Sequence, residues 1–434
     1  MYEVAKRFLP GGDTRSAAYY TPYPVFMDKG EGVRLYDVDG NVYLDFLNNY
    51  TSMIHGHAHP KIVEAVMEQI SRGTAYAAPT ESQYRLGEII CERVKSVEQV
   101  RFCNSGTEAT LMAIRAAIAY TGKDKVVKIE GGYHGSHDTA EISSPDMDLE
   151  KAGPAETPIP VVPPGVPRDV SGYVLVTPFN NREVAERVIK RNRKDLAAVI
   201  VEPVMGAAGM VTPKDGYLRF LREITAENDI LLIFDEVITF RLSSGGAQEL
   251  YGVEPDLTSL GKIIGGGYPV GAFGGHEEVM RVYNPELAPE GKFMKHSGTF
   301  NANTVTCAAG IASMELLTPQ TIERINLLGD ALRRDITGVF EELGVRAQVK
   351  GVGSLGNIHF NEEEIVDFRS SKRSNKELAE LLHLSMLSNG IFLARRGMFN
   401  ISTPMSKEET KQFIEALRKS LMKMKPVIKE LTFA

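Results

Sequence analysis

Lys262 is the residue whose surroundings point most directly to covalent chemistry. It lies in the stretch Leu260–Gly267, where its neighbours are apolar residues or glycine. Burial disfavours a charged ammonium, and a lysine amine driven towards neutrality can form an imine with an aldehyde. A Walker-type phosphate loop would require Ser or Thr directly after the lysine, and Ile263 occupies that place. We therefore predict that Lys262 carries an aldehyde-bearing group.

A carboxylate, Asp235, directly follows the apolar run Ile230–Phe234. A buried Asp stays ionised only beside a cationic partner or several hydrogen-bond donors. The protonated nitrogen of a pyridine ring is such a partner, and the ion pair keeps that ring able to accept electrons. The motif alone leaves a second interpretation open, a structural Asp that caps the next helix.

The turn Asn104–Glu108 combines small polar residues with the start of a helical pattern. Gly106 lets the backbone approach a ligand closely, and Ser105 and Thr107 offer hydroxyl groups. The free N–H groups of a helix start favour an anion. The turn is therefore expected to hold a phosphate, with a plain helix cap as the alternative.

An aromatic residue, Tyr133, follows another apolar run within the motif Gly132-Tyr-His-Gly135. Aromatic rings stack on planar heterocycles, so Tyr133 would cover one face of a cofactor ring and Val237 would press on the other. The histidines of the sequence also suggest a metal site, but they lack an HExxH-type pair and an acidic partner. No metal is expected. The four motifs together predict pyridoxal 5′-phosphate.

These residues need a parallel sheet, because ligands bind at the carboxyl ends of its strands. Between residues 98 and 310 short apolar runs alternate with helical segments such as Glu108–Thr121 and Asp215–Glu227, which predicts a mostly parallel sheet covered by helices. The predicted strands are Val100–Cys103, Lys125–Glu130, Ala197–Glu202, Ile230–Phe234, Leu257–Leu260 and Gly271–Gly274.

The chain has 434 residues, more than one core usually supports, and the pattern outside residues 98–310 predicts a smaller α+β domain. Val33–Phe46 has the pattern of a hairpin, the stretches 351–360 and 391–402 those of strands, and 407–425 that of a closing helix. We expect residues 1–50 and 311–434 to form the small domain and residues 51–310 the large one. The Pro- and Gly-rich segment 141–171 is expected to be a long loop, either a lid or a surface excursion.

Composition limits the function classes. A net charge of −7 and a pI near 5.8 argue against a nucleic-acid binder. The first twelve residues lack the apolar stretch of a signal peptide, and no apolar run reaches membrane-spanning length. Three cysteines without metal or CxxC spacing fit a reducing compartment. We expect a cytoplasmic enzyme that binds neither nucleic acid nor membrane.

Taken together, the motifs resemble the class III aminotransferases, which are fold-type I pyridoxal-phosphate enzymes. The resemblance runs from about residue 10 to 404 and rests on these stretches: Cys103-Asn-Ser-Gly-Thr-Glu-Ala109, Gly132-Tyr-His-Gly135, Phe234-Asp-Glu-Val237, Asp256-Leu-Thr-Ser-Leu-Gly-Lys-Ile-Ile-Gly-Gly-Gly267 and His296-Ser-Gly-Thr-Phe-Asn301. It implies an α/β fold, with a seven-stranded, mostly parallel sheet flanked by helices in the large domain and a smaller α+β domain built from the chain ends.

The resemblance also implies roles for individual residues. Lys262 would be the Schiff-base lysine, and Thr299 would reach the phosphate held by a neighbouring subunit, so the enzyme would be a homodimer with composite active sites. The other residues implied in cofactor binding are Ser105, Gly106, Thr107, Tyr133, His134, Glu202, Asp235 and Val237.

Two subgroups of the family are most similar, the glutamate-1-semialdehyde aminomutases and the β-amino-acid aminotransferases. The stretches 245–253 and 261–267 favour the mutases, whereas Pro10-Gly-Gly-Asp-Thr-Arg-Ser16, His296-Ser-Gly-Thr-Phe-Asn301 and Arg396-Gly397 resemble the second group. Guanidinium groups bind carboxylates in a bidentate manner, so Arg15 and Arg396 are expected to bind substrate carboxylates, with ordinary salt bridges as the alternative. We further expect the pocket walls to include Tyr20, Met53, Ile54 and Met205.

The predicted reaction is transamination between an amino acid, such as β-phenylalanine, and an α-keto acid, such as 2-oxoglutarate or pyruvate. An aminomutase, which shifts an amino group within one molecule, is the main alternative. A racemase and a ligand sensor without turnover are further alternatives.

Overall fold

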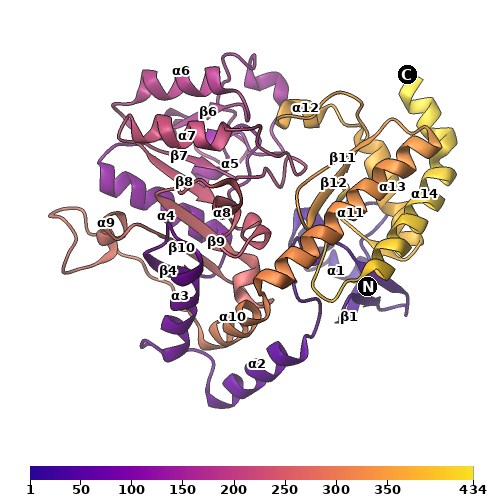
Figure 1. Ribbon diagram of the computed structural model, residues 1–434, viewed down its shortest axis with the longest axis horizontal. Helices are drawn as coiled ribbons and strands as arrows, with labels where there is room; N and C mark the ends of the chain where they lie inside the picture. Colours follow the sequence, from indigo (N-terminus) through magenta and orange to yellow (C-terminus); the bar gives the residue numbers. More distant parts are fainter. Residues whose placement is uncertain (434) are drawn as a thin grey trace.

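A seven-stranded sheet forms the centre of the large lobe in the computed structural model, which describes residues 1–433 (Figure 1). Its strand order is β4-β10-β9-β8-β7-β5-β6, and only β10 runs antiparallel to its neighbours. The strands are β4 (Gln99–Cys103), β5 (Lys125–Ile129), β6 (Val174–Thr177), β7 (Leu196–Val201), β8 (Leu231–Asp235), β9 (Leu257–Gly261) and β10 (Gly271–Gly275). All six predicted strands are confirmed, and β6 is the strand that the sequence did not reveal.

Helices cover both faces of this sheet, as its apolar sequence requires. Val199 of β7 packs with α6 (Arg182–Asn192) and α7 (Tyr217–Ala226), whereas its neighbour Ile200 packs on the other face with α4 (Gly106–Thr121). Successive side chains of a strand point to opposite faces, so a run that is apolar throughout, as β7 is, must be covered twice. The doubly covered sheet predicted from the sequence is therefore present.

The remaining helices of this lobe and its connections are shorter or peripheral. They are α2 (Pro60–Arg72), α3 (Glu81–Arg93), α5 (Asp138–Glu141), α8 (Ala247–Tyr251), α9 (Glu277–Met280) and α10 (Thr304–Leu316). The segment 141–171 has only short 3₁₀ turns, but Ile142 and Ala152 within it are buried. Parts of this segment therefore pack onto the lobe.

The chain ends meet in a second lobe, drawn at the right of Figure 1. Its four-stranded sheet pairs β13 (Ile391–Phe392) with β3 (Val42–Asp45), so the two ends of the chain share hydrogen bonds. Its other strands and its helices are β1 (Met27–Glu31), β2 (Arg34–Asp37), β11 (Gln348–Lys350), β12 (Leu355–His359), β14 (Met398–Asn400), α1 (Tyr2–Ala5), α11 (Pro319–Leu343), α12 (Phe368–Lys372), α13 (Lys376–Ser388) and α14 (Lys407–Phe433). The domain boundaries at residues 50 and 310 stay a prediction, and residue 434 of the predicted C-terminal part lies outside the described residues.

The predicted strand at 391–402 is two strands that join different sheets. Gly397, at φ 88°, turns the chain between β13 and β14. A Cβ atom at this position would lie 2.6 Å from the carbonyl oxygen of Ile358, so both the conformation and the space require glycine. This turn carries Arg396, one of the predicted substrate residues.

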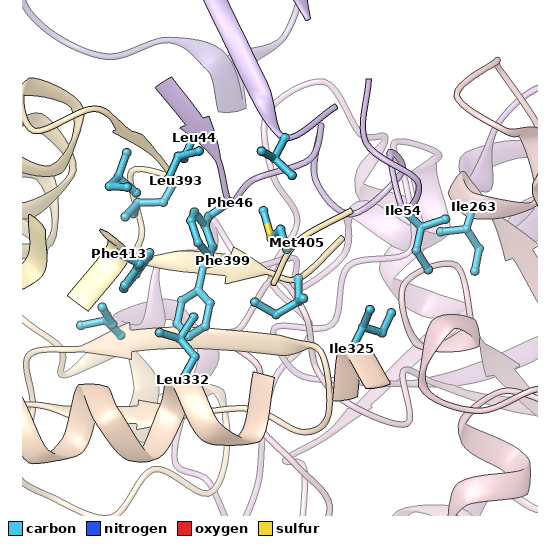
Figure 2. Close-up of a cluster of buried hydrophobic side chains, with 14 of the residues drawn as sticks. Leu44, Phe46, Ile54, Ile263, Ile325, Leu332, Leu393, Phe399, Met405 and Phe413 are labelled. Atoms are coloured by element: carbon cyan, nitrogen blue, oxygen red, sulfur yellow. The ribbon is translucent and has the colours of Figure 1, made fainter. Parts of the chain in front are cut away.

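One apolar core continues from the small lobe into the large one (Figure 2). Phe46, Phe399 and Phe413 pack ring against ring in the small lobe, with centroids 4.8 and 5.4 Å apart for the two pairs that share Phe413. Ile54 and Ile263 belong to the same cluster at its other end. Because such interiors are close-packed, the segment after β3 and the segment after β9 are fixed relative to each other. Among residues 1–433, no helix is both long and apolar enough to cross a membrane.

Candidate active site

A cavity of about 340 Å³ opens at the carboxyl ends of the parallel strands. It collects residues that are far apart in the sequence, because β4, β5, β7, β8 and β9 all end at this edge of the sheet. The predicted residues among its walls are Gly106, Thr107, Tyr133, His134, Glu202, Asp235, Val237 and Lys262. Eight of the twelve predicted site residues thus share one cavity.

Lys262 begins a 3₁₀ turn directly after β9, in the left-handed region at φ 48°. This conformation costs about 1–3 kcal/mol for a residue with a side chain and is kept only where the surroundings enforce it. Burial lowers the pKa of the Lys262 amine; the negative charges of Asp235 and Glu202 partly oppose this, and the Arg396 charge adds to it. A lowered pKa enlarges the fraction of neutral, nucleophilic amine.

Asp235 is 5% exposed at the end of β8. Nδ1 of His134 donates to its Oδ2 at 2.8 Å, and the backbone N–H of Val237 donates to its Oδ1 at 3.1 Å. The 3₁₀ turn that follows starts at Thr239 and has no side-chain cap, which disfavours the helix-cap interpretation of Asp235. His134 in turn is held by Thr110, whose hydroxyl donates to its carbonyl oxygen. The Asp235 carboxylate is therefore fixed in orientation at the cavity wall.

Glu202 organises the loop that carries Tyr133. Its carboxylate accepts the backbone N–H groups of Tyr133 and Gly206, both at 2.9 Å. Burial raises the pKa of Glu202, and the nearby Asp235 acts in the same direction, whereas His134 and the two N–H groups oppose the shift. The Tyr133 side chain itself is 44% exposed and borders the cavity.

The start of α4 also lines the cavity. Gly106 and Thr107 supply N–H groups of the first helical turn, which have no acceptor inside the helix and attract an anion. Ser105 does not line the cavity, and its Oγ accepts the N–H of Glu108 at 3.2 Å as a helix cap. Val237 packs against both Gly106 and Gly261, where added Cβ atoms would lie 3.0 and 3.3 Å from its side chain.

The two predicted arginines lie beside a segment that precedes α2. The Arg396 guanidinium lies 5.8 Å from the centroid of the Tyr50 ring; desolvation by the protein around it lowers its pKa, although the residue as a whole is exposed. Arg15 donates to Oδ1 of Asn49 at 2.7 Å. Arg395, adjacent to Arg396, instead approaches Glu380 on α13 at 3.7 Å. Neither Arg15 nor Arg396 is among the cavity walls as the structure stands, although the charge of Arg396 acts on Lys262.

Thr299 is exposed and lies outside this cavity. The pocket-wall residues expected from the sequence, Tyr20, Met53, Ile54 and Met205, are not among the lining residues either. Sequence reasoning missed Asn49 and Ser52, which do line the cavity. The run Asn48-Asn-Tyr-Thr51 carried a turn signal that could have drawn attention to this segment.

The donor set of the cavity fits pyridoxal phosphate. An anion-attracting helix start, a buried carboxylate and a lysine amine all line it. Nε2 of His134 is buried without a hydrogen-bond partner among the described residues, beside the carboxylate that would receive a ring nitrogen. The described residues contain no cluster of three or more His, Cys, Asp or Glu placed to hold a metal.

Fold and site therefore define a fold-type I pyridoxal-phosphate enzyme. The family model of class III aminotransferases matches residues 15–421, and the chain belongs to this family. Its cofactor is pyridoxal 5′-phosphate, and it is an enzyme of amino-group transfer.

Three relatives show how the chain is similar to known members. A glutamate-1-semialdehyde 2,1-aminomutase from Methanosphaera stadtmanae is 40% identical over 98% of both chains. The crystal structure of an omega-transaminase from Sphaerobacter thermophilus is 45% identical, with a TM-score of 0.92 over 97% of this chain and 96% of that one. A β-phenylalanine aminotransferase from Variovorax paradoxus is 35% identical, with a TM-score of 0.89 over 98% and 93%.

Proposed function

We propose that the chain transfers the amino group of a β-amino acid, such as β-phenylalanine, to an α-keto acid, such as 2-oxoglutarate or pyruvate. The observation that carries this proposal is the Arg396 guanidinium, which lies over Tyr50 and has no carboxylate within ion-pair distance among the described side chains. Arg15 provides a second guanidinium nearby, because it donates a hydrogen bond to Asn49, the residue next to Tyr50. Two guanidinium groups suit a reaction with two substrates, because the carboxylate of a β-amino acid lies one carbon farther from the reacting carbon than that of an α-keto acid.

The second candidate is glutamate-1-semialdehyde 2,1-aminomutase. Curated relatives with that name are 40–43% identical over 91–98% of this chain, and judged by those names alone this candidate has the better support. The named transaminase structures and the basic pair Arg395–Arg396 favour the first candidate. Both candidates use the same cofactor residues and differ in whether a second substrate is needed.

The residues of the chain divide the work as follows. When bound, pyridoxal phosphate supplies a sink for the electron pair of the bond broken at the amine-bearing carbon. Nζ of Lys262 would hold the cofactor and, once free, would act as the base that accepts the proton from the amine-bearing carbon. The negative charge of Asp235, which His134 orients, would favour the protonated form of the cofactor ring.

The other residues bind and orient. Gly106 and Thr107 would bind the phosphate through the start of α4, and Ser105 caps that helix. Tyr133 and Val237 would contact the cofactor ring, and Glu202 holds the loop that carries Tyr133. Thr299 serves the phosphate of a partner subunit, so the active form would be a homodimer; its exposure in the single chain fits that role. The three free cysteines fit a cytoplasmic enzyme.

The test uses purified holoenzyme and a panel of α-, β- and ω-amino acids, with absorbance near the band of the lysine-bound cofactor as the readout. A β-amino acid should bleach this band in a single turnover, and 2-oxoglutarate or pyruvate should restore it. Sustained turnover of glutamate-1-semialdehyde without any keto acid would instead establish the aminomutase. A β-amino acid that leaves the band unchanged would refute the first candidate.

A further inference from the structure

Four consecutive residues next to the cavity adopt left-handed backbone conformations. Asn48, Asn49, Tyr50 and Thr51 have φ values of 47°, 47°, 53° and 79°. L-residues other than glycine visit this region singly, and a β-branched residue such as Thr51 is an outlier there. Such a run persists only where the surrounding structure over-determines it. We call residues 48–51 the left-handed turn.

The N-terminal end of the left-handed turn is held by the buried carboxylate of Asp45. Oδ1 of Asp45 accepts the backbone N–H groups of Leu47 and Asn48 at 2.9 and 2.8 Å. Its Oδ2 pairs with Nε2 of His57 at 2.7 Å. The side chain of Asn48 reaches Asn400 on β14, with distances of 3.2 Å to its carbonyl oxygen and 3.1 Å to its Oδ1.

The C-terminal end of the left-handed turn is held by the fully buried guanidinium of Arg241. It donates to Oδ1 of Asn400 at 3.0 Å, to Oγ of Ser354 at 2.9 Å and to the carbonyl oxygen of Thr51 at 3.5 Å, and also to Ile401. No carboxylate lies within ion-pair distance among the described side chains, and burial lowers the pKa of Arg241 to about 9. Burying a cation that has only neutral hydrogen-bond acceptors is costly, so we expect a role of Arg241 other than an ion pair.

Two side chains of the left-handed turn contact the predicted substrate arginines. Oδ1 of Asn49 accepts a hydrogen bond from the Arg15 guanidinium, and the Tyr50 ring lies under Arg396. The Tyr50 hydroxyl donates to the carbonyl oxygen of Ala17 at 2.6 Å, which fixes the ring. Asn49 is itself part of the cavity wall.

We propose that Arg241 is a positioning residue for carboxylate recognition: it holds the left-handed turn in place, so that Asn49 and Tyr50 set Arg15 and Arg396 for the substrate. This inference rests on the proposed function and names the internal support of its carboxylate site. Arg241 lies in the large lobe, while Asn400 and Ile401 lie in the small one, so the support spans both lobes.

The left-handed turn carries local features that cost stability. Oγ1 of Thr51 and Oδ1 of Asn48 are buried without a hydrogen-bond partner among the described residues. Glycine at position 51 would remove the backbone strain and the unpaired hydroxyl together. Thr51→Gly is therefore expected to keep or raise the melting temperature while it loosens the turn, a separation that a merely structural role would not produce.

The experiment measures the binding of 3-phenylpropanoate, a carboxylate without an amine, to the holoenzyme by titration calorimetry, with neutral 3-phenylpropanamide as the matched probe. Arg241→Met should weaken binding of the acid at least tenfold and Thr51→Gly at least threefold, with little effect on the amide. Arg93→Met is the control variant, because Arg93 also caps two carbonyl oxygens, those of Leu317 and Met314, away from the turn. It should bind the acid like the wild type.

The outcomes separate the two proposals. Failure of a β-amino acid to bleach the cofactor would count against the proposed function alone. Wild-type enzyme that does not prefer the acid over the amide, or Thr51→Gly protein that binds the acid as tightly as the wild type, would overturn the positioning role. An equal loss of acid binding in Arg93→Met would do the same. If Arg241→Met does not fold, Thr51→Gly decides the question.

Discussion

Replacing Arg396 by glutamine should separate substrates that carry a carboxylate from those that do not. The Arg396 guanidinium lies over Tyr50 without a carboxylate partner among the described side chains, so its charge is free for a substrate. A hydrogen bond to a charged group contributes about 1.5–3 kcal/mol. Since about 1.4 kcal/mol corresponds to a factor of ten, Arg396→Gln should lower kcat/KM for β-phenylalanine by about 10- to 150-fold.

The assay compares β-phenylalanine with 1-phenylethylamine, which lacks the carboxylate, in single-turnover bleaching of the cofactor band. Arg395→Gln is the matched control, because Arg395 is partly exposed and approaches Glu380 on α13, and such surface pairs contribute about 0–1 kcal/mol. The amine should react equally with wild type and both variants. An equal loss for both donors in Arg396→Gln, or an equal effect of Arg395→Gln, would refute the assignment of Arg396 to the carboxylate.

Three further predictions concern charge and burial. Asp235→Asn keeps a hydrogen-bond partner for His134 but loses the charge, and should slow the first half-reaction by about 10- to 150-fold in stopped-flow absorbance, whereas an unchanged rate would contradict its role. Glu130 is 1% exposed and accepts two N–H groups of Arg369 at 2.6 and 2.7 Å, so Arg369→Met leaves a buried unpaired carboxylate. The loss in unfolding free energy should be about 3–5 kcal/mol in denaturant titrations, and a loss below about 1 kcal/mol would argue against this role of Arg369. Burial lowers the pKa of His383 to about 4, so its contribution to stability is present above about pH 6.5 and is lost as the pH falls towards 4. His383→Leu should remove roughly 2 kcal/mol of that acid sensitivity, measured as stability at pH 7 against pH 4.5, and a variant as acid-sensitive as the wild type would disprove it.

The sequence predicted the parts of the site that follow strands. Glu202 and Asp235 come at the ends of apolar runs, and Lys262 directly follows the buried strand β9; the parallel order of these strands brings their ends to one edge. Local pattern and topology agree there, so the prediction needed no long-range information. The same logic identified the start of α4 at Gly106.

The parts that could not be predicted depend on contacts between distant segments. The left-handed turn lines the cavity because Asp45, Asn400 and Arg241 hold it, and only Asp45 is near it in sequence. The strand β6 is a four-residue apolar run, too short to distinguish from a loop. Which of two adjacent arginines faces Tyr50 is decided by the turn at Gly397, whose close approach to Ile358 is tertiary.

The capture of the cofactor by one amine is the most direct test of the whole account. Apoprotein is mixed with pyridoxal phosphate, the covalent link is reduced with borohydride, and the labelled lysine is identified by peptide mapping. Because burial lowers the pKa of Lys262, the label should be found there and disappear in Lys262→Met. A label on any other lysine, or a cofactor band that survives in Lys262→Met, would contradict the account.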